Sequence, residues 1–302
     1  MTDVRVLERV ARNAPLGLRF WDTAAATAAI DGLSVEVFPR ANPRARAMAQ
    51  VNRSGVYVVH ALPVTSPPPS PRDFEFTDAE PDVLWSAATR AYRVEVTDPA
   101  GRFLPIAFDA DLPARGLYPW RTPWLSPPQL VAPTGAPGTP PPLLVEGVPL
   151  FSASSRPVPE PLAVVYAHIH EMGTAREAAW SLLTVAIDGI VRGVGLADGH
   201  GRVAVMFPYP EPPRMSLASP PEARNDFTWE VSLTAFWLAT SPPGPAPAIA
   251  DLADVFASLS TPRTVVESTV SPAMPLRLTY REALTARTAG TAGADASLLL
   301  VS

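Results

Sequence analysis

The chain of 302 residues contains no cysteine, which excludes disulfides, thiolate catalysis and cysteine-ligated zinc. Lysine is also absent, since all 24 basic residues are arginine. This removes a P-loop lysine, a Schiff-base lysine and a Ser–Lys dyad from the candidate chemistry. A GC-rich genome, which favours arginine, alanine, proline and glycine codons, explains the missing lysine by itself, and the catalytic exclusions hold in either case.

Long apolar runs and clusters of basic residues are missing as well. No stretch approaches the roughly 18 consecutive apolar residues that a membrane-spanning helix needs. The first 19 residues mix acidic and basic side chains, unlike the apolar centre of a signal peptide. The net charge is −5 and the arginines are scattered singly, whereas a nucleic-acid-binding protein has a basic stripe. We therefore expect a soluble, cytoplasmic protein that has no membrane span and binds no nucleic acid.

Proline, by contrast, is abundant. The 38 prolines far exceed the usual fraction of about 5%, while a hydrophobic content of 47% and a mean hydropathy of +0.11 are ample for a buried core. Because proline lacks the N–H that helix interiors and sheet ladders use, this composition favours short strands joined by stiff connections.

A four-residue turn pattern recurs three times. Residues 52–55 (Asn-Arg-Ser-Gly), 98–101 (Asp-Pro-Ala-Gly) and 198–201 (Asp-Gly-His-Gly) each begin with Asp or Asn and end with Gly. The Asp or Asn side chain bonds the nearby backbone and the Gly accepts a positive φ, so the pattern predicts hairpin turns. The similarity of residues 52–58 to residues 198–204 also indicates a divergent internal repeat.

Alternation of apolar and polar residues predicts the strands. It is clear at residues 33–38, 92–96 and 227–235, and residues 162–170 are also expected to form a strand. We expect the second turn to pair residues 92–96 with 102–106, and the third turn to pair residues 190–196 with 202–207.

The C-terminal part of the sequence combines helical and strand signals. Residues 249–259 carry apolar side chains at i, i+3, i+6, i+7 and i+10, which predicts a short helix. Residues 296–301 are apolar and predict a strand. That strand has two interpretations, since it can close the sheet of its own domain or add to the sheet edge of a neighbouring molecule.

Together these signals predict a mostly all-β fold: tandem prealbumin/Ig-like β-sandwich domains with proline-rich arms and one short helix near the C-terminus. We expect a first sandwich in residues 1–118 and a proline-rich arm or linker in residues 119–156. A second sandwich repeat is expected in residues 157–221. Residues 222–302 are expected to supply C-terminal strands and the helix, and to complete the second domain.

The chain has only four histidines, at positions 60, 168, 170 and 200. His168 and His170 are two residues apart on a predicted strand, so both rings face the same side, and Glu171 is nearby. This pair is a candidate metal site, although no third ligand is evident from the sequence. The alternative is an ordinary half-exposed strand face, which we favour.

Other candidate sites have simpler explanations. An acidic cluster suggests calcium but matches no EF-hand spacing, so it reads as a solvated loop; it comprises Asp73, Glu75, Asp78, Glu80 and Asp82. Asp198 and His200 are explained by the turn. No Gly-x-Ser-x-Gly elbow and no Rossmann glycine pattern is present. We therefore expect a protein that is not an enzyme, with no catalytic residues, no cofactor and no metal.

Several segments resemble known families. Residues 31–35, 52–57 and 195–203 resemble carboxypeptidase-regulatory-like and other prealbumin-like β-sandwich repeats, which are non-catalytic structural or adhesive modules. In addition, the combination of segments across residues 19–210 resembles proteins encoded among contractile injection system, or phage-tail-like, genes; these segments are residues 19–23, 52–57, 101–105 and 205–210.

The resemblance implies a structural subunit of a phage-tail-like particle, in the cap, an adaptor layer or the baseplate. Its partners would be other particle subunits in a multi-copy symmetric assembly, formed in the cytoplasm, with release of the particle as a second option. The candidate assembly contacts are Trp120, Trp124, Leu298, Leu299 and Leu300. The alternative function is a carbohydrate- or ligand-binding module that uses Trp85, Trp120 and Trp124.

Overall fold

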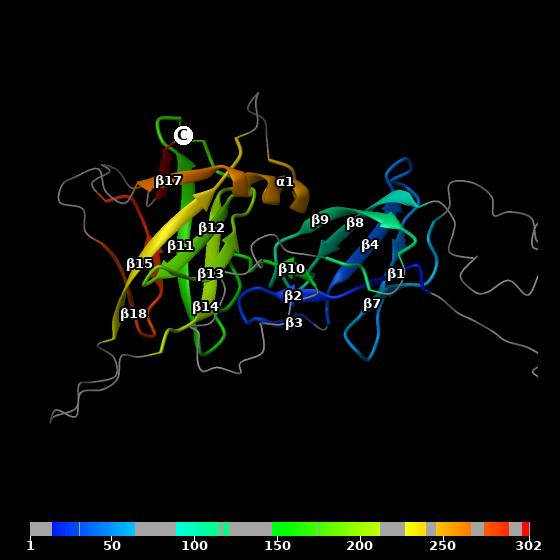
Figure 1. Ribbon diagram of the computed structural model, residues 1–302, viewed down its shortest axis with the longest axis horizontal. Helices are drawn as coiled ribbons and strands as arrows, with labels where there is room; N and C mark the ends of the chain where they lie inside the picture. Colours follow the sequence, from blue (N-terminus) through cyan, green and yellow to red (C-terminus); the bar gives the residue numbers. More distant parts are fainter. Residues whose placement is uncertain are drawn as a thin grey trace, which may run out of the picture.

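The computed structural model describes residues 14–29, 31–63, 89–114, 117–120, 147–174, 176–211, 227–239, 246–266, 275–289 and 298–301. Of these, 51% lie in strands and 5% in helical turns. This confirms the prediction of a mostly-β chain with several sheets and a short helix near the C-terminus. Figure 1 shows two groups of strands side by side, with the helix α1 at the border between them.

The first group, here called the N-terminal β domain, contains three small sheets with the orders β16-β9-β8-β4-β5, β1-β7-β6 and β10-β2-β3. Its strands are β1 (Leu16–Leu18), β2 (Phe20–Asp22), β3 (Thr27–Ala29), β4 (Ser34–Pro39), β5 (Ala47–Met48), β6 (Gln50–Val51), β7 (Tyr57–Val59), β8 (Arg90–Thr97), β9 (Ile106–Leu112), β10 (Val148–Leu150) and β16 (Ala250–Asp251).

Strand alternation builds the core of this domain. Along β8, Tyr92, Val94 and Val96 are buried while the residues between them are partly exposed. They share one apolar cluster with Phe20 and Tyr57 of the smaller sheets, whose rings meet edge to face with centroids 5.2 Å apart. The sheets therefore enclose their apolar faces as in a sandwich.

The second group, the C-terminal β domain, is one nine-stranded sheet of order β13-β12-β15-β17-β20-β11-β14, with β18 paired to β15 and β19 paired to β11. Its strands are β11 (Leu162–Glu171), β12 (Leu182–Ile187), β13 (Ile190–Leu196), β14 (Arg202–Pro208), β15 (Thr228–Phe236), β17 (Pro262–Val266), β18 (Leu276–Thr279), β19 (Leu284–Ala286) and β20 (Leu298–Val301). Four of them, β11, β13, β14 and β15, coincide closely with strands predicted from the sequence.

The third turn forms an arch and not the predicted hairpin. β13 pairs with β12, and β14 pairs with β11, so the expected pairing of β13 with β14 is wrong. The two strands instead meet face to face. A Cβ on Gly193 would lie 2.9 Å from side-chain atoms of Val205 and Phe207, and one on Gly195 would lie 2.9 Å from Val203. The two glycines let β13 lie directly on the buried side chains of β14.

The second turn does join paired strands, but with a longer connection than predicted. β8 and β9 are antiparallel, and β9 begins at Ile106 and not at residue 102. The intervening residues bond elsewhere: Phe103 bridges to Ser152, and the N–H of Leu104 donates to the carbonyl of Phe151 at 2.9 Å. The hairpin is confirmed, while the start of its return strand is corrected.

A segment of the C-terminal part crosses to the N-terminal β domain. β16 pairs in parallel with β9, and the helix α1 (Leu252–Ala257) follows it, continued by a 3₁₀ turn at Ser258–Ser260. The carboxylate of Asp251 caps the helix by accepting from the N–H of Ala253 at 2.8 Å. No helix in the described part of the chain is long and apolar enough to cross a membrane.

The predicted division into residues 1–118, 119–156, 157–221 and 222–302 stays a prediction. The structure places two short pieces of these ranges in the N-terminal β domain. β10, from the expected arm, pairs in parallel with β2. β16 and α1, from the last range, join the core of the N-terminal β domain through Ala250, Leu252 and Val255.

Candidate functional site

The three Asp/Asn-x-x-Gly turns share one set of bonds. In each, the Gly N–H donates to the carbonyl of the first residue, at 3.0, 2.9 and 3.0 Å for Gly55, Gly101 and Gly201. The side chain of the first residue accepts from the backbone N–H groups two and four positions later. This confirms the turn chemistry, and it engages one carboxylate oxygen of Asp198 with two N–H groups of the turn.

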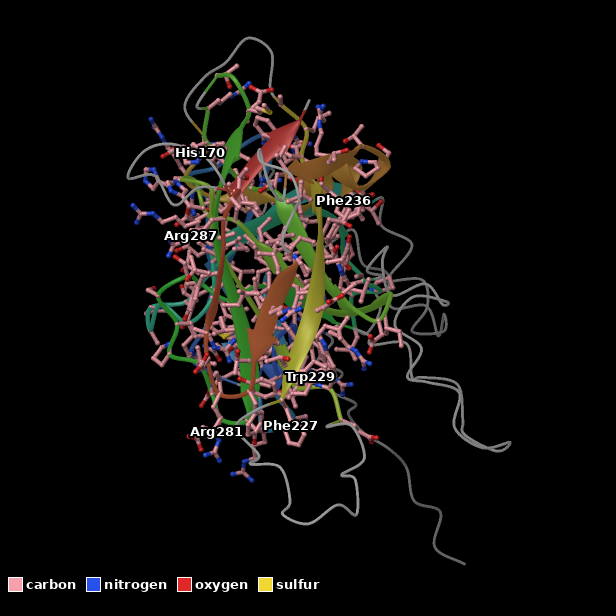
Figure 2. All side chains as sticks on the ribbon, turned by 90° about the vertical axis from the view of Figure 1, so that its left-hand side faces the viewer. His170, Phe227, Trp229, Phe236, Arg281 and Arg287 are labelled. Atoms are coloured by element: carbon pink, nitrogen blue, oxygen red, sulfur yellow. The ribbon has the colours of Figure 1, made fainter. Side chains whose placement is uncertain are left out.

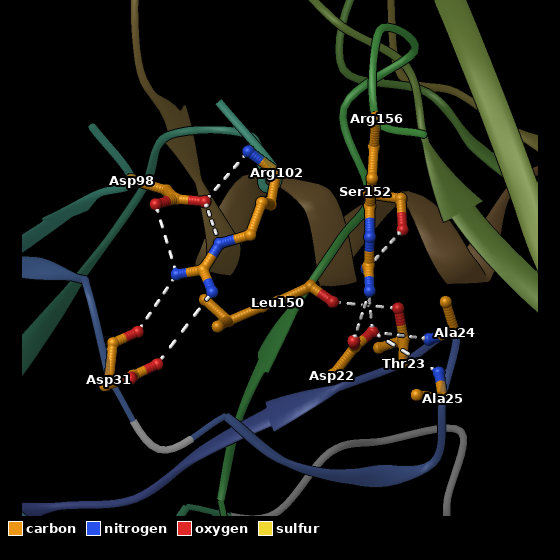
Figure 3. A network of polar contacts seen from close by, with 10 residues as sticks. All are labelled: Asp22, Thr23, Ala24, Ala25, Asp31, Asp98, Arg102, Leu150, Ser152 and Arg156. Atoms are coloured by element: carbon orange, nitrogen blue, oxygen red, sulfur yellow. Dashed lines mark hydrogen bonds and ion pairs between the residues drawn. The ribbon is translucent and has the colours of Figure 1, made fainter. Parts of the chain in front are cut away.

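A buried ion pair joins β2 to the segment between β10 and β11. The Asp22 carboxylate lies at the end of β2. It accepts hydrogen bonds from the two terminal guanidinium nitrogens of Arg156, at 2.7 and 3.1 Å (Figure 3). It also accepts from the N–H of Ala24, while the Ser152 hydroxyl accepts from Arg156 at 2.9 Å. No local pattern of residues predicts this pair, because its members lie 134 positions apart.

A second polar network stiffens the turn at Asp98. Burial by itself raises the pKa of Asp98, but hydrogen bonds from the Arg102 guanidinium and from two backbone N–H groups bring it below its ordinary value. Arg102 also donates to the carbonyl of Asp31 at 2.9 Å (Figure 3), and its pKa is raised, mainly by its bond to Asp98. The turn is thereby tied to the loop that precedes β4.

The junction where β16 and α1 join the N-terminal β domain combines charge and aromatic contacts. Arg93 of β8 forms ion pairs with Asp109 of β9 and with Asp251, the residue that caps α1. Burial lowers the pKa of Arg93, but its bonds to Asp251 and Asp109 outweigh this and raise it. Close by, Trp120 packs between Phe108 and Phe256, with ring centroids 5.0 and 5.9 Å away.

The histidine pair singled out in the sequence lies near one end of β11. The rings of His168 and His170 are 4.2 Å apart, as their spacing predicts. Figure 2 shows His170 at one end of β11, away from Trp229 and Arg281 at the other end of the sheet. Glu171, named with them, instead accepts a hydrogen bond from Thr174. The third group beside the histidines is Glu177, which the sequence did not reveal.

The predicted assembly contacts have different positions. Trp120 is half-buried against its own chain. Leu298, Leu299 and Leu300 belong to β20, whose backbone lies between β17 and β11 of the same sheet, and the side chain of Leu298 is fully buried. The remaining residues lie outside the described part of the chain: Trp124, Trp85 and the acidic cluster at residues 73–82.

A scan against models of protein families finds no match, and neither does a search of curated proteins or of solved structures.

Proposed function

We propose that the chain is a non-catalytic structural subunit of a contractile, phage-tail-like particle, assembled in the cytoplasm as part of its cap, an adaptor layer or its baseplate. In this role it acts through protein–protein contacts with other subunits in a multi-copy symmetric assembly. The observation that carries the proposal is the position of β16 (Ala250–Asp251), which pairs in parallel with β9 at the edge of the five-stranded sheet of the N-terminal β domain. A subunit of a mechanical assembly needs domains that keep their relative position.

Several contacts at this junction support such a rigid body. Leu252 and Val255 of α1 are buried in the N-terminal core. Asp251 both caps the helix and binds Arg93 of β8. Because inter-domain motion is expected where the interface is small and polar, the mixed apolar and ionic junction favours a fixed arrangement.

A second ion pair holds the chain where it enters the C-terminal β domain. Arg156, just before that domain, is held by the buried carboxylate of Asp22 on β2. The chain therefore connects the two domains at two places, near residue 156 and at residues 250–256. At each place an ion pair binds the connecting segment to a strand of the N-terminal β domain. Two well-separated anchors restrict rotation more than either of them alone.

The second candidate, a carbohydrate- or ligand-binding module, receives less support. Stacking on a sugar requires an accessible aromatic face. One of the three tryptophans named for this role, Trp120, packs with its ring against Phe108 and Phe256. Binding of the isolated chain on a glycan array would favour this alternative over the structural role.

The decisive experiment uses the full chain in its own host. Particles are purified by sedimentation from cells that express a tagged copy, and their proteins are quantified by mass spectrometry. We expect the chain to migrate with sheath and tube proteins in a fixed ratio, and we expect incomplete particles when its gene is deleted. Particles of normal composition and shape without the chain would contradict the proposal.

A matched pair of variants links the junction to assembly. Asp251→Ala removes the helix cap and the partner of Arg93, so we expect less of the chain in the particles. Asp254→Ala changes an exposed carboxylate of the same helix and serves as the control. Equal incorporation of the two variants would mean that assembly does not depend on the contacts of Asp251.

A further inference from the structure

We infer that His168, His170 and Glu177 form a binding site for a divalent transition-metal ion. One ligand atom from each of the three residues lies within 4.8 Å of the others. Two imidazole nitrogens and one carboxylate oxygen are a donor set that suits Zn²⁺, with a position left for water or a further ligand. This inference goes beyond the proposed function and does not rest on it.

The backbone brings the three side chains together through a tight reversal after β11. The N–H of Glu171 donates to the carbonyl of Arg176 at 2.8 Å, and the N–H of Ala178 donates to the carbonyl of Ile169 at 2.9 Å. Between these bonds, His170 and Glu177 form an antiparallel bridge. Residues directly opposite in such a bridge point to the same face of the sheet, which places the Glu177 carboxylate beside the imidazole of His170.

The orientation of His168 is set by a bond to the third turn. Its Nε2 lies 2.8 Å from the carbonyl oxygen of His200. A carbonyl oxygen only accepts, so Nε2 carries the proton and the lone pair of the neutral ring is on Nδ1. Histidines that bind metals typically donate their other ring N–H in this way, to a carbonyl or a carboxylate, which fixes the tautomer.

The surroundings include a candidate fourth ligand, which would be the third nitrogen, and an opposing positive charge. Nδ1 of His200 lies 3.4 Å from the carboxylate of Glu177, which makes this imidazole a candidate fourth ligand. Three of the four histidines of the chain thus converge on one carboxylate. Arg202 lies opposite His168 in the ladder with β14, and its exposed positive charge weakens the attraction for a cation.

A metal at this position would link three segments through their side chains, in addition to the backbone bonds that already join Ile169 to Gly201 and to Ala178. His168 and His170 belong to β11, Glu177 to the returning segment, and His200 to the arch between β13 and β14. The side chains of Glu177 and His200 are 44% and 72% exposed, so an ion can enter from solvent. Binding to the folded state alone would raise the stability of the chain in proportion to the logarithm of the free metal concentration.

The test uses the full chain without a histidine tag, stripped of metal with EDTA and dialysed. ZnCl₂ is titrated calorimetrically, and Co²⁺ is added separately to record its visible absorption, which reports the coordination geometry. We expect one Zn²⁺ per chain, a Co²⁺ spectrum of low coordination number, and a higher melting temperature with Zn²⁺.

Variants assign the binding to these residues. We expect His170→Ala and Glu177→Gln each to weaken Zn²⁺ binding at least tenfold, and Arg202→Gln to strengthen it. His60→Ala and Glu171→Gln are matched controls, because His60 is exposed in the N-terminal β domain and Glu171 bonds to Thr174. Circular dichroism checks that each variant is folded. If His170→Ala fails to fold, Glu177→Gln still tests the site, because Glu177 is exposed and its substitution leaves the core intact.

Three results would overturn the inference. The first is the absence of stoichiometric Zn²⁺ binding. The second is binding that is unchanged in Glu177→Gln, and the third is an equal loss of binding in His60→Ala. Any of them would mean that the contacts among His168, His200 and Glu177 serve only to stabilise the turns.

Discussion

The guanidinium of Arg156 and the carboxylate of Asp22 form a bidentate ion pair, although they lie 134 positions apart in the sequence. Their side chains are only 10% and 9% exposed. Arg156 also lies over the ring of Phe103, 4.8 Å from its centroid. The pair therefore fastens β2 to the segment that leads into the C-terminal β domain.

Breaking this pair from one side should be costly. Asp22→Ala leaves a buried guanidinium without its carboxylate and removes the acceptor of the Ala24 N–H. We expect a loss of about 3–5 kcal/mol in the free energy of unfolding, measured by urea denaturation.

An exposed ion pair supplies the control for that measurement. Arg40 and Asp109 are 2.8 Å apart, but their side chains are 64% and 39% exposed. Arg40→Ala should therefore cost less than about 1 kcal/mol. If Asp22→Ala cost no more than Arg40→Ala, the buried pair would not contribute as proposed.

Two of the turn glycines allow the strain of a positive φ to be distinguished from the clash of an added Cβ. Gly101 and Gly201 have φ angles of +66° and +72°, so alanine at either position is strained by about 1–2 kcal/mol. A Cβ on Gly101 meets nothing within 4 Å, whereas one on Gly201 would lie 2.5 Å from the carbonyl oxygen of Ile169.

We therefore expect Gly201→Ala to lower the free energy of unfolding by roughly 1–3 kcal/mol more than Gly101→Ala does. Chemical denaturation of the two variants under the same conditions measures the difference. Equal losses would mean that the backbone around Ile169 yields without cost, and would contradict the close approach of the turn to β11.

Stability should depend on the charge of Asp98 in acid. Its pKa is below the ordinary value of 3.8 in the folded state, because the bonds from Arg102 and two backbone N–H groups outweigh the effect of burial. A carboxylate with a lowered folded pKa stabilises the protein above its unfolded pKa, and this contribution is lost as the pH falls through the folded value.

Asp98→Asn tests this with little change of shape, since the first turn already carries Asn52 in the equivalent position. The variant should be less stable than the wild type at pH 6, and the difference should shrink as the pH falls below the ordinary pKa of 3.8. Unfolding free energies at a series of pH values give the comparison. A difference that stayed constant over this range would assign the effect to something other than the charge.

The terminal strand should stabilise its own chain. Leu298 is fully buried within the C-terminal core, so Leu298→Ala should cost about 2–5 kcal/mol. Leu238→Ala is the control, because the exposed fraction of Leu238 is 53% and its truncation should have little effect. Equal stability of the two variants would contradict the observed position of β20.

Deletion of residues 296–302 extends this test to assembly. The truncated chain should melt at a lower temperature, because β17 and β11 lose the strand between them. A monomer that melts unchanged but no longer assembles would instead mean that the strand is donated to a neighbouring molecule.

Local patterns predicted the elements of this fold well. Alternation located residues 227–235, which coincide with β15 to within one residue at each end. The helix expected at residues 249–259 is present as α1 with a 3₁₀ extension. Strand alternation and the helical spacing of apolar residues both reflect which side of a segment is buried. The order of apolar and polar residues along the segment shows this directly.

The candidate site was only half visible in the sequence. His168 and His170 share a face because strand side chains alternate, and their spacing alone shows it. Glu177 joins them because the backbones of Glu171 and Arg176 are bonded to each other, and the only turn signal between these two residues in the sequence is Gly173. A tight turn placed there would have set Glu177 opposite His170.

The sequence by itself determined the β character, the three Asp/Asn-x-x-Gly turns and the shared face of two histidines, because each depends on residues a few positions apart. Only the tertiary structure decided that β13 crosses β14 without pairing, that residues 250–256 join the N-terminal β domain, and that Asp22 meets Arg156. These arrangements depend on partners that are far apart in the chain, and their free energy comes from burial and charge pairing, which no local pattern encodes.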